Sequence, residues 1–190
     1  SIDTRSIKKN NLFLAIKGNK NDGNKFISEA FKNGATCVAS TSKSNVNKTK
    51  IIKINNSISF LNNFGKLKRD QSLAKIIAIT GSAGKTSLKN LINNLLKHFG
   101  KTYSSPKSFN NHYGVPISLS NLSYNDQFGI FEVGMSKARE IRNLTKLIKP
   151  QIGIITNIGE AHIENFKNTK GIANAKSEII ENIETGGTII

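Results

Sequence analysis

The sequence predicts an α/β fold, with a small α/β domain at the N-terminus and a doubly wound parallel sheet after it. The main observation is that short apolar runs alternate along the chain with longer segments of helical periodicity. Alternating β and α elements of this kind form parallel sheets with helices on the faces. A second observation is a change near residue 73, where the strands become more apolar and the helices longer.

Residues 1–72 are expected to form the N-terminal domain. Strands are predicted at 12–17, 36–40 and 50–54, the last two flanking a polar loop at 41–50. A helix is predicted at 26–34, ended by Gly34, and a second one at 57–69. The second helix is predicted to bury one side, which carries Ile58, Leu61, Phe64 and Leu67. The polar break at 70–72 is the expected boundary between the domains.

Residues 73–190 are expected to form the second domain. The run AKIIAIT at 74–80 is continuously apolar, as in a strand covered on both faces of a parallel sheet. Leucine, isoleucine and phenylalanine then recur at helical spacing from Leu88 to Phe99, and Gly100 supplies a stop. Further strands are predicted at 128–133, 152–156 and 187–190, with helical segments between them.

The composition excludes several classes of protein. A formal net charge of +16 first suggests a nucleic-acid binder, but the lysines are spread among asparagines along the whole chain. We therefore expect no nucleic-acid partner, while an anionic small substrate would be favoured by this charge. No apolar run approaches the roughly 20 residues of a membrane span. The single Cys37 rules out a disulfide framework and is compatible with a reducing, cytoplasmic location.

The stretch TGSAGKTS at 80–87 joins the first strand of the second domain to its helix. A strand, a glycine turn and a helix in this order direct backbone N–H groups at one point, which predicts an anion site. Lys85 would contact the terminal phosphates of a nucleotide, and the Thr86 hydroxyl would ligate Mg²⁺. The usual P-loop pattern requires Gly at position 79, where this chain has Ile79. The less favoured alternative is a glycine-rich turn with a chance Lys-Thr pair.

Several further motifs follow in a fixed order. They are FNNHYGVPISL (109–119), FEVGMSKAREI (131–141), TNIGEAHIENF (156–166) and AKSEI (175–179), preceded by an N-terminal segment at 3–35 with LFLAIKG and DG. Together with TGSAGKTS they resemble the Mur ligases, the ATP-dependent amide-forming enzymes of peptidoglycan synthesis. One departure is Arg139, where the family usually has Gly before the Glu-Ile pair.

The resemblance implies an ATP-dependent ligase. Within the family the loop is most similar to that of the branch that adds D-alanyl-D-alanine to UDP-N-acetylmuramoyl-tripeptide through an acyl phosphate. It implies a UDP-sugar-binding domain at 1–72, a partial P-loop ATPase domain at 73–190, and a third domain absent from these residues. We therefore expect these 190 residues to be monomeric, to bind nucleotide weakly and to form no product.

Alternative functions remain open. One is the branch that adds a diamino acid to the dipeptide precursor. The N-terminal segment argues against the related folylpolyglutamate synthases. A non-catalytic nucleotide-binding fragment and a basic nucleic-acid binder are the alternatives from another class.

The candidate nucleotide-binding residues are Gly81, Ser82, Ala83, Gly84, Lys85, Thr86, Ser87 and Asn157. Glu132 lies at the carboxyl end of its predicted strand, where open α/β sheets place ligands, and a carboxylate suits Mg²⁺. A solvent-facing Glu is the equally weighted alternative, and the motif favours the metal. The resemblance further makes His162 a ligand of a second Mg²⁺, although a lone His is more often a packed or surface residue.

The resemblance also makes Lys176 a carbamylated metal and phosphate ligand, because it lies at the motif's lysine, 14 residues after His162. The alternative is a helix lysine paired with Glu178. The expected catalytic group is therefore Lys85, Glu132, His162 and Lys176, with Thr86 as an additional metal ligand.

The candidate substrate-binding residues lie in two places. Asn110 and Asn111 precede the GVP stretch on a loop, where they would orient phosphate or the acyl substrate. A turn with Asn in left-handed conformations is the alternative. Asp3, Thr4 and Arg5 are candidates for the uridine diphosphate, since an Arg fork suits a diphosphate. A capping Asp beside a surface Arg is the alternative there.

Overall fold

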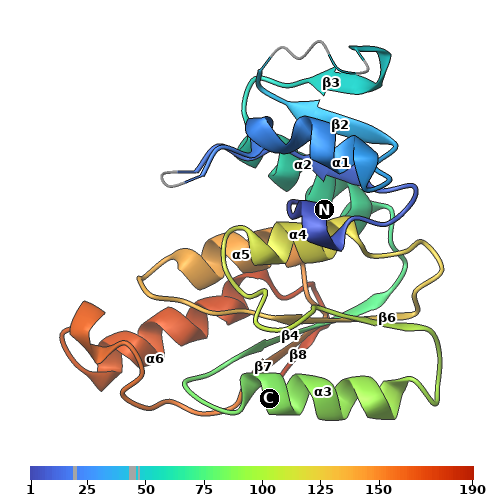
Figure 1. Ribbon diagram of the computed structural model, residues 1–190. Helices are drawn as coiled ribbons and strands as arrows, with labels where there is room; N and C mark the ends of the chain where they lie inside the picture. Colours follow the sequence, from blue (N-terminus) through green and yellow to red (C-terminus); the bar gives the residue numbers. More distant parts are fainter. Residues whose placement is uncertain (19–20, 43–45, 47) are drawn as a thin grey trace. The chain divides into compact units, whose positions relative to one another are not determined.

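The structure is a computed structural model that describes residues 1–18, 21–42, 46 and 48–190 (Figure 1). It divides into two compact units, Ser1–Asn63 and Phe64–Ile190, and each is described by itself. The division falls inside helix α2 (Ser57–Asp70), upstream of the boundary expected at 70–72. Of the predicted polar loop, residues 43–45 and 47 lie outside the described residues.

The first unit contains a three-stranded parallel sheet in the order β1-β2-β3. Its elements are β1 (Leu12–Leu14), α1 (Ile27–Lys32), β2 (Cys37–Ser40) and β3 (Ile51–Lys53), with 3-10 helices at Thr4–Ser6, Gly23–Phe26 and Lys48–Lys50. The helix packs on the sheet through Ile27 and Ala30, which meet Phe13 and Val38. All three predicted strands and the first helix are present, each shorter than predicted.

The second unit contains a five-stranded sheet in the order β5-β6-β4-β7-β8, and every neighbouring pair is parallel. Its strands are β4 (Lys75–Thr80), β5 (Thr102–Ser104), β6 (Phe128–Glu132), β7 (Ile152–Ile155) and β8 (Thr188–Ile189). Its helices are α3 (Lys85–Leu96), α4 (Gly114–Ser120), α5 (Glu140–Ile148) and α6 (Thr169–Ser177), with 3-10 helices at Ile163–Asn165 and Glu178–Asn182. The predicted doubly wound parallel sheet is confirmed, and β5 is an edge strand that the sequence analysis missed.

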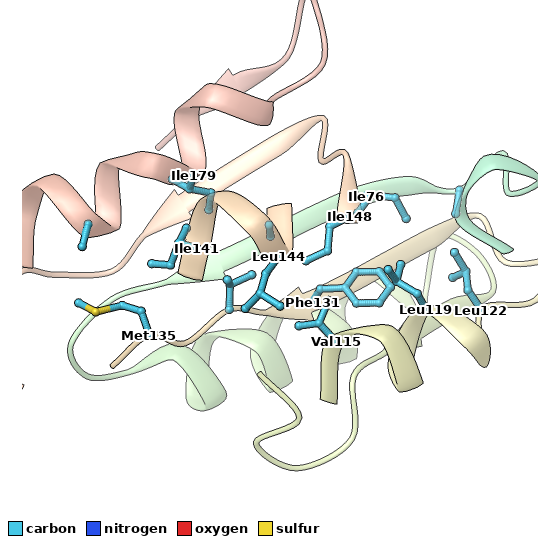
Figure 2. Close-up of a cluster of buried hydrophobic side chains, with 14 of the residues drawn as sticks. Ile76, Val115, Leu119, Leu122, Phe131, Met135, Ile141, Leu144, Ile148 and Ile179 are labelled. Carbon is cyan, nitrogen blue, oxygen red and sulfur yellow. The ribbon is translucent and has the colours of Figure 1, made fainter. Parts of the chain in front are cut away.

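Helices cover both faces of this sheet (Figure 1). Side chains alternate between the faces along a strand. Ile76, Ala78 and Phe131 pack against the side of α4 and α5, in the cluster that Figure 2 shows. Ile77, Ile79 and Ile130 pack against α3 on the other side. Burial on both faces explains why 74–80 reads as a continuous apolar run. Among the described residues, no helix combines the length and apolar character that a membrane crossing requires.

The predicted apolar side of α2 is buried at Leu61 and half-buried at Ile58 and Phe64, but the helix departs from the prediction in its last turns. Leu67 was expected to be buried, but it is 51% exposed. Gly65 and Arg69 are buried instead. A Cβ at Gly65 would lie 3.0 Å from the Pro116 carbonyl oxygen, so a side chain there would require the neighbouring backbone to shift. The guanidinium of Arg69 donates to the carbonyls of Ile148 and Lys149, at the C-terminal end of α5.

The N-terminal end of α5 is capped by a distant carboxylate. Glu178 accepts hydrogen bonds from the backbone N–H groups of Arg139 and Arg142, at 2.7 and 3.1 Å. Negative charge stabilises this end of a helix. Arg139 itself has a φ of 71°, in the left-handed region that favours glycine. Arg139, which stands where the family usually has Gly, therefore occupies a strained backbone position.

We predict that Arg139→Gly stabilises the protein. A left-handed conformation costs a non-Gly residue roughly 1–2 kcal/mol, and the added flexibility of the unfolded chain offsets about 0.4–1 kcal/mol. The free energy of unfolding, measured in urea, should rise by up to about 1 kcal/mol. Arg139→Ala keeps the strain and should give no such increase. A less stable Arg139→Gly protein would contradict this explanation.

Candidate active site

Three neighbouring strands carry the candidate site at their carboxyl ends. Parallel β4, β6 and β7 end at Thr80, Glu132 and Ile155, and β4 lies between the other two. The chain returns across β4 on its way from β6 to β7, so the order of the strands reverses here. Open α/β sheets bind ligands at such a switch point. The glycine loop, Glu132 and the segment that leads to His162 therefore converge.

The glycine loop has the geometry of an anion site. Gly84 has a φ of 79° and precedes the first residue of α3, so the free N–H groups of the helix start at Lys85. Gly81 has a φ of 148°, and a Cβ at this position would lie 1.9 Å from the Thr156 hydroxyl oxygen. Each glycine is thus required by backbone conformation, and Gly81 by close approach as well. This shorter loop forms the turn although position 79 is Ile.

The Lys85 side chain folds back over this loop. Its Nζ donates to the Gly81 carbonyl at 2.7 Å and lies 3.5 Å from the Ser82 carbonyl. Lys85 also lines a cavity at the end of the sheet. The ammonium is therefore held beside the free helix N–H groups, where a phosphate would meet both.

Asn157 contacts the loop and does not line the cavity. Its Oδ1 accepts from the backbone N–H groups of Ser82 and Ala83, at 3.0 and 2.9 Å. Ser82 Oγ donates to the Gly159 carbonyl at 3.0 Å, and Thr156 Oγ1 donates to the Ala83 carbonyl at 2.6 Å. The segment after β7 is thereby joined to the glycine loop. This arrangement makes Asn157 a support of the loop.

Glu132 is buried, with 2% of its side chain exposed, so the solvent-facing alternative is wrong. Its Oε2 accepts from Thr86 Oγ1 at 2.7 Å, and its Oε1 accepts from Asn110 Nδ2 at 2.8 Å. The described residues contain no group of three or more His, Cys, Asp and Glu that would form a metal cage. Mg²⁺ instead uses one or two carboxylates with phosphate and water. The adjacent Thr86 hydroxyl and Glu132 carboxylate fit this requirement.

The cavity of about 410 Å³ gathers predicted site residues from several elements. Those that line it are Gly81, Ser82, Lys85, Asn110, Asn111, His162 and Lys176. The sequence analysis missed others, which include His112, Ser136, Glu140 and Asn143. His112 occupies a variable position of the NN-x-x-GVP stretch, and Asn143 lies within α5. The sequence pattern therefore did not indicate either residue as part of the site. The volume suits a small-molecule site.

Lys176 lies in the wall of this cavity with 3% of its surface exposed. Burial and the charge of Lys85 lower the pKa of Lys176 to about 8. Its alternative partner, Glu178, instead caps α5. Among the described residues, Lys176 Nζ has no hydrogen bond or ion pair. The geometry is that of a buried amine that faces a cavity without a counter-ion.

His162 also lines the cavity, while its side chain is 49% exposed. Its Nδ1 lies 3.8 Å from Glu164 Oε1, and its φ of 66° is left-handed. Ser87 is exposed on α3 and does not line the cavity.

The candidate substrate residues have local roles in this structure. Asn111 Oδ1 accepts from the N–H groups of Tyr113 and Gly114, so it caps the start of α4. Neither Asn110 nor Asn111 has a positive φ, so the left-handed alternative is wrong for both.

In the first unit, Asp3 caps a 3-10 helix and pairs with exposed Arg5 at 2.7 Å. Thr4 Oγ1 donates to Glu29 Oε1 at 2.6 Å. These contacts match the alternative of a capping Asp beside a surface Arg, and a substrate role for the three residues stays a prediction.

Comparison with protein families and curated relatives gives a consistent result. Residues 79–190 match the Mur ligase middle domain, and residues 1–83 match the Mur ligase family, catalytic domain. The UDP-N-acetylmuramoyl-tripeptide--D-alanyl-D-alanine ligase of Rickettsia prowazekii is 42% identical, over 95% of this chain and 40% of its own length. The ligase of the same name from Bacillus subtilis is 33% identical, over 99% of this chain and 42% of its own. The chain thus spans about two fifths of the length of these relatives.

Solved structures are similar over nearly the whole chain. MurF from Acinetobacter baumannii superposes with a TM-score of 0.87 and 30% identity, over 100% of this chain and 42% of its own. MurF ligase from Thermotoga maritima, solved in complex with ADP, gives a TM-score of 0.81 and 30% identity, over 97% and 43% of the two chains. Sequence motifs, family models and fold agree. The chain belongs to the Mur ligase family.

Proposed function

We propose that this chain is the nucleotide-activating part of a ligase that adds D-alanyl-D-alanine to UDP-N-acetylmuramoyl-tripeptide. The observation that carries the proposal is the pairing of Thr86 with Glu132 at 2.7 Å, directly behind the loop that holds Lys85. The pair joins the start of α3 to the end of β6, and its two side chains would hold the magnesium ion of a bound ATP. The names of the relatives favour D-alanyl-D-alanine over a diamino acid as acceptor.

In this reaction a substrate carboxylate oxygen attacks the γ-phosphorus of ATP, and the bond to the β,γ-bridging oxygen breaks. The products of that step are an acyl phosphate and ADP. The amine of D-alanyl-D-alanine then attacks the acyl carbon, loses a proton and expels inorganic phosphate. Such chemistry needs positioning and charge neutralisation and no protein nucleophile. We assign the phosphates to the N–H groups that begin α3 and to Lys85. Thr86 and Glu132 would hold a magnesium ion, which would supply positive charge to the phosphates.

We further propose that Lys176 is carbamylated. A neutral lysine amine adds CO₂ to give a carbamate and a proton, which converts a cation into an anion with two oxygens. Lys176 is buried against the cavity beside Lys85, and both features favour the neutral amine that the addition requires. The carbamate, with His162 of the same cavity, would supply ligands for a second Mg²⁺.

The first unit is proposed to bind the uridine diphosphate end of the substrate, with Asp3, Thr4 and Arg5 as contacts. Binding would require the Asp3–Arg5 pair to open, which is feasible because the Arg5 side chain is 86% exposed and the Asp3 side chain 41%. We also propose a cytoplasmic monomer, consistent with the unpaired Cys37.

Replacing Lys85 should weaken nucleotide binding. Hydrogen bonds to charged groups contribute about 1.5–3 kcal/mol, so Lys85→Ala should weaken Mg·ADP binding by at least about tenfold in calorimetry. Lys97→Ala, at an exposed site after α3, is the matched control and should bind normally. Unchanged affinity in Lys85→Ala, or salt-sensitive binding of duplex DNA, would contradict the proposal.

Carbamylation of Lys176 should be detectable as a ¹³C signal, and the size of that signal should depend on pH. With a pKa of about 8, the neutral fraction of Lys176 rises from roughly a tenth at pH 7 to a half at pH 8. In protein equilibrated with ¹³CO₂, a carbamate carbon signal should therefore grow steeply over this interval. An ordinary lysine would respond only near pH 10. The signal should persist in Lys170→Ala, at an exposed site on α6, and disappear in Lys176→Ala. Identical spectra for the unmodified protein and Lys176→Ala would exclude carbamylation.

The chain alone is expected to bind nucleotide without ligating. Product formation should require the rest of the ligase, and there D-alanyl-D-alanine should be accepted in preference to a diamino acid. Mass spectrometry of reactions with each acceptor separates the two branches. Robust ligation by residues 1–190 alone would contradict the proposal that product formation requires the rest of the ligase.

A further inference from the structure

One buried cation in the second unit lies outside the residues assigned above. Lys89, on α3, has 1% of its surface exposed and is among the largest fully buried side chains. Lysines are almost never fully buried unless they are paired. Lys89 lies one helical turn after Lys85, so both project from the same side of the helix. The groups that contact this buried charge should therefore indicate its function.

The ammonium of Lys89 has two oxygen neighbours from different segments. It donates to the Lys107 carbonyl, and its Nζ lies 3.6 Å from Glu132 Oε2. Each member of the Lys89–Glu132 pair has only 2% of its side chain exposed. Removing one member of such a pair leaves an uncompensated buried charge. Glu132 is thus held by a third contact besides Thr86 and Asn110.

The Lys107 carbonyl belongs to a segment that returns to the same carboxylate. Lys107 has a φ of 47°, an unfavourable conformation for a non-Gly residue. Three residues later, Asn110 donates to Glu132 Oε1, and its carbonyl accepts from the Gly134 N–H at 2.8 Å. A Cβ at Gly134 would lie 3.0 Å from the Asn110 side chain, so the fit is close. Lys89 fixes the start of this segment and Glu132 fixes its end.

We propose that Lys89 is a positioning residue for the metal–nucleotide site: it holds the Glu132 carboxylate and anchors residues 107–110. Lys89 does not line the cavity, so it acts through Glu132 and Asn110 and not through a contact with nucleotide. The inference rests on the proposed function of this site. The inference adds Lys89 to the site. Replacing Lys89 should change only the part of the nucleotide affinity that depends on magnesium.

The test is nucleotide affinity with and without magnesium. Calorimetric Kd values for ADP would be measured in Mg²⁺ and in EDTA, for the unmodified chain and for Lys89→Gln. Gln keeps a donor for the Lys107 carbonyl but has no charge. The factor by which Mg²⁺ tightens binding should fall about fivefold or more, while the Kd in EDTA stays the same. A merely structural role would weaken both affinities together.

Two matched variants complete the comparison. Lys89→Arg restores the charge and should recover most of the magnesium effect. Lys97→Gln, exposed just beyond the same helix, should leave both Kd values unchanged. An undiminished magnesium effect in Lys89→Gln, or equal losses with and without the ion, would overturn the inference while leaving the proposed function intact. If the unmodified chain shows no magnesium-dependent binding, the proposed function fails.

A stability measurement tests the pair independently of nucleotide. Lys89→Met should lower the urea midpoint strongly, because Glu132 is left buried without its cation. The double variant Lys89→Met, Glu132→Gln removes both charges and should unfold at a higher urea concentration than Lys89→Met alone. If Lys89→Met does not fold, the double variant should still fold. A double variant no more stable than Lys89→Met would show that the two side chains are not coupled.

Discussion

The arrangement of the candidate site depends on one buried carboxylate. Glu132 lies at the end of β6 with almost no exposure, and a buried carboxylate requires partners for both oxygens. Thr86 comes from the start of α3 and Asn110 from the segment before α4. Lys89 approaches from within α3. Two separate parts of the chain, α3 and the segment before α4, are thereby fixed around a single group on β6, at the place where a phosphate-bound cation would lie.

The opposite side of the glycine loop is fixed by the segment after β7. Thr156, Asn157 and Gly159 all bond to the loop, and Thr156 also occupies the space that a side chain at Gly81 would need. Because β7 is adjacent to β4, the segment after β7 lies next to the loop that follows β4. The same segment continues to His162. The loop and the cavity wall therefore form a connected structure.

Much of this arrangement was predictable from local sequence. The β4 run, the glycine turn and the position of Glu132 at the end of a strand follow from periodicity and from the rule that parallel strands present ligands at their carboxyl ends. The roles of individual side chains were less accessible. Asn157 supports the loop from the segment after β7, which is distant in sequence, and the short strand β5 has no distinct pattern. On α2, close packing of Gly65 against Pro116 outweighed the apolar periodicity that placed Leu67 inside.

The central claim is that the loop and Glu132 together hold a magnesium-bound nucleotide. A crystal structure of this chain with a nonhydrolysable ATP analogue and Mg²⁺ tests it most directly. The account predicts phosphate density over the N–H groups that begin α3, and a metal in contact with Thr86 Oγ1 and a Glu132 oxygen. An empty loop, or a metal coordinated without Glu132, would contradict it.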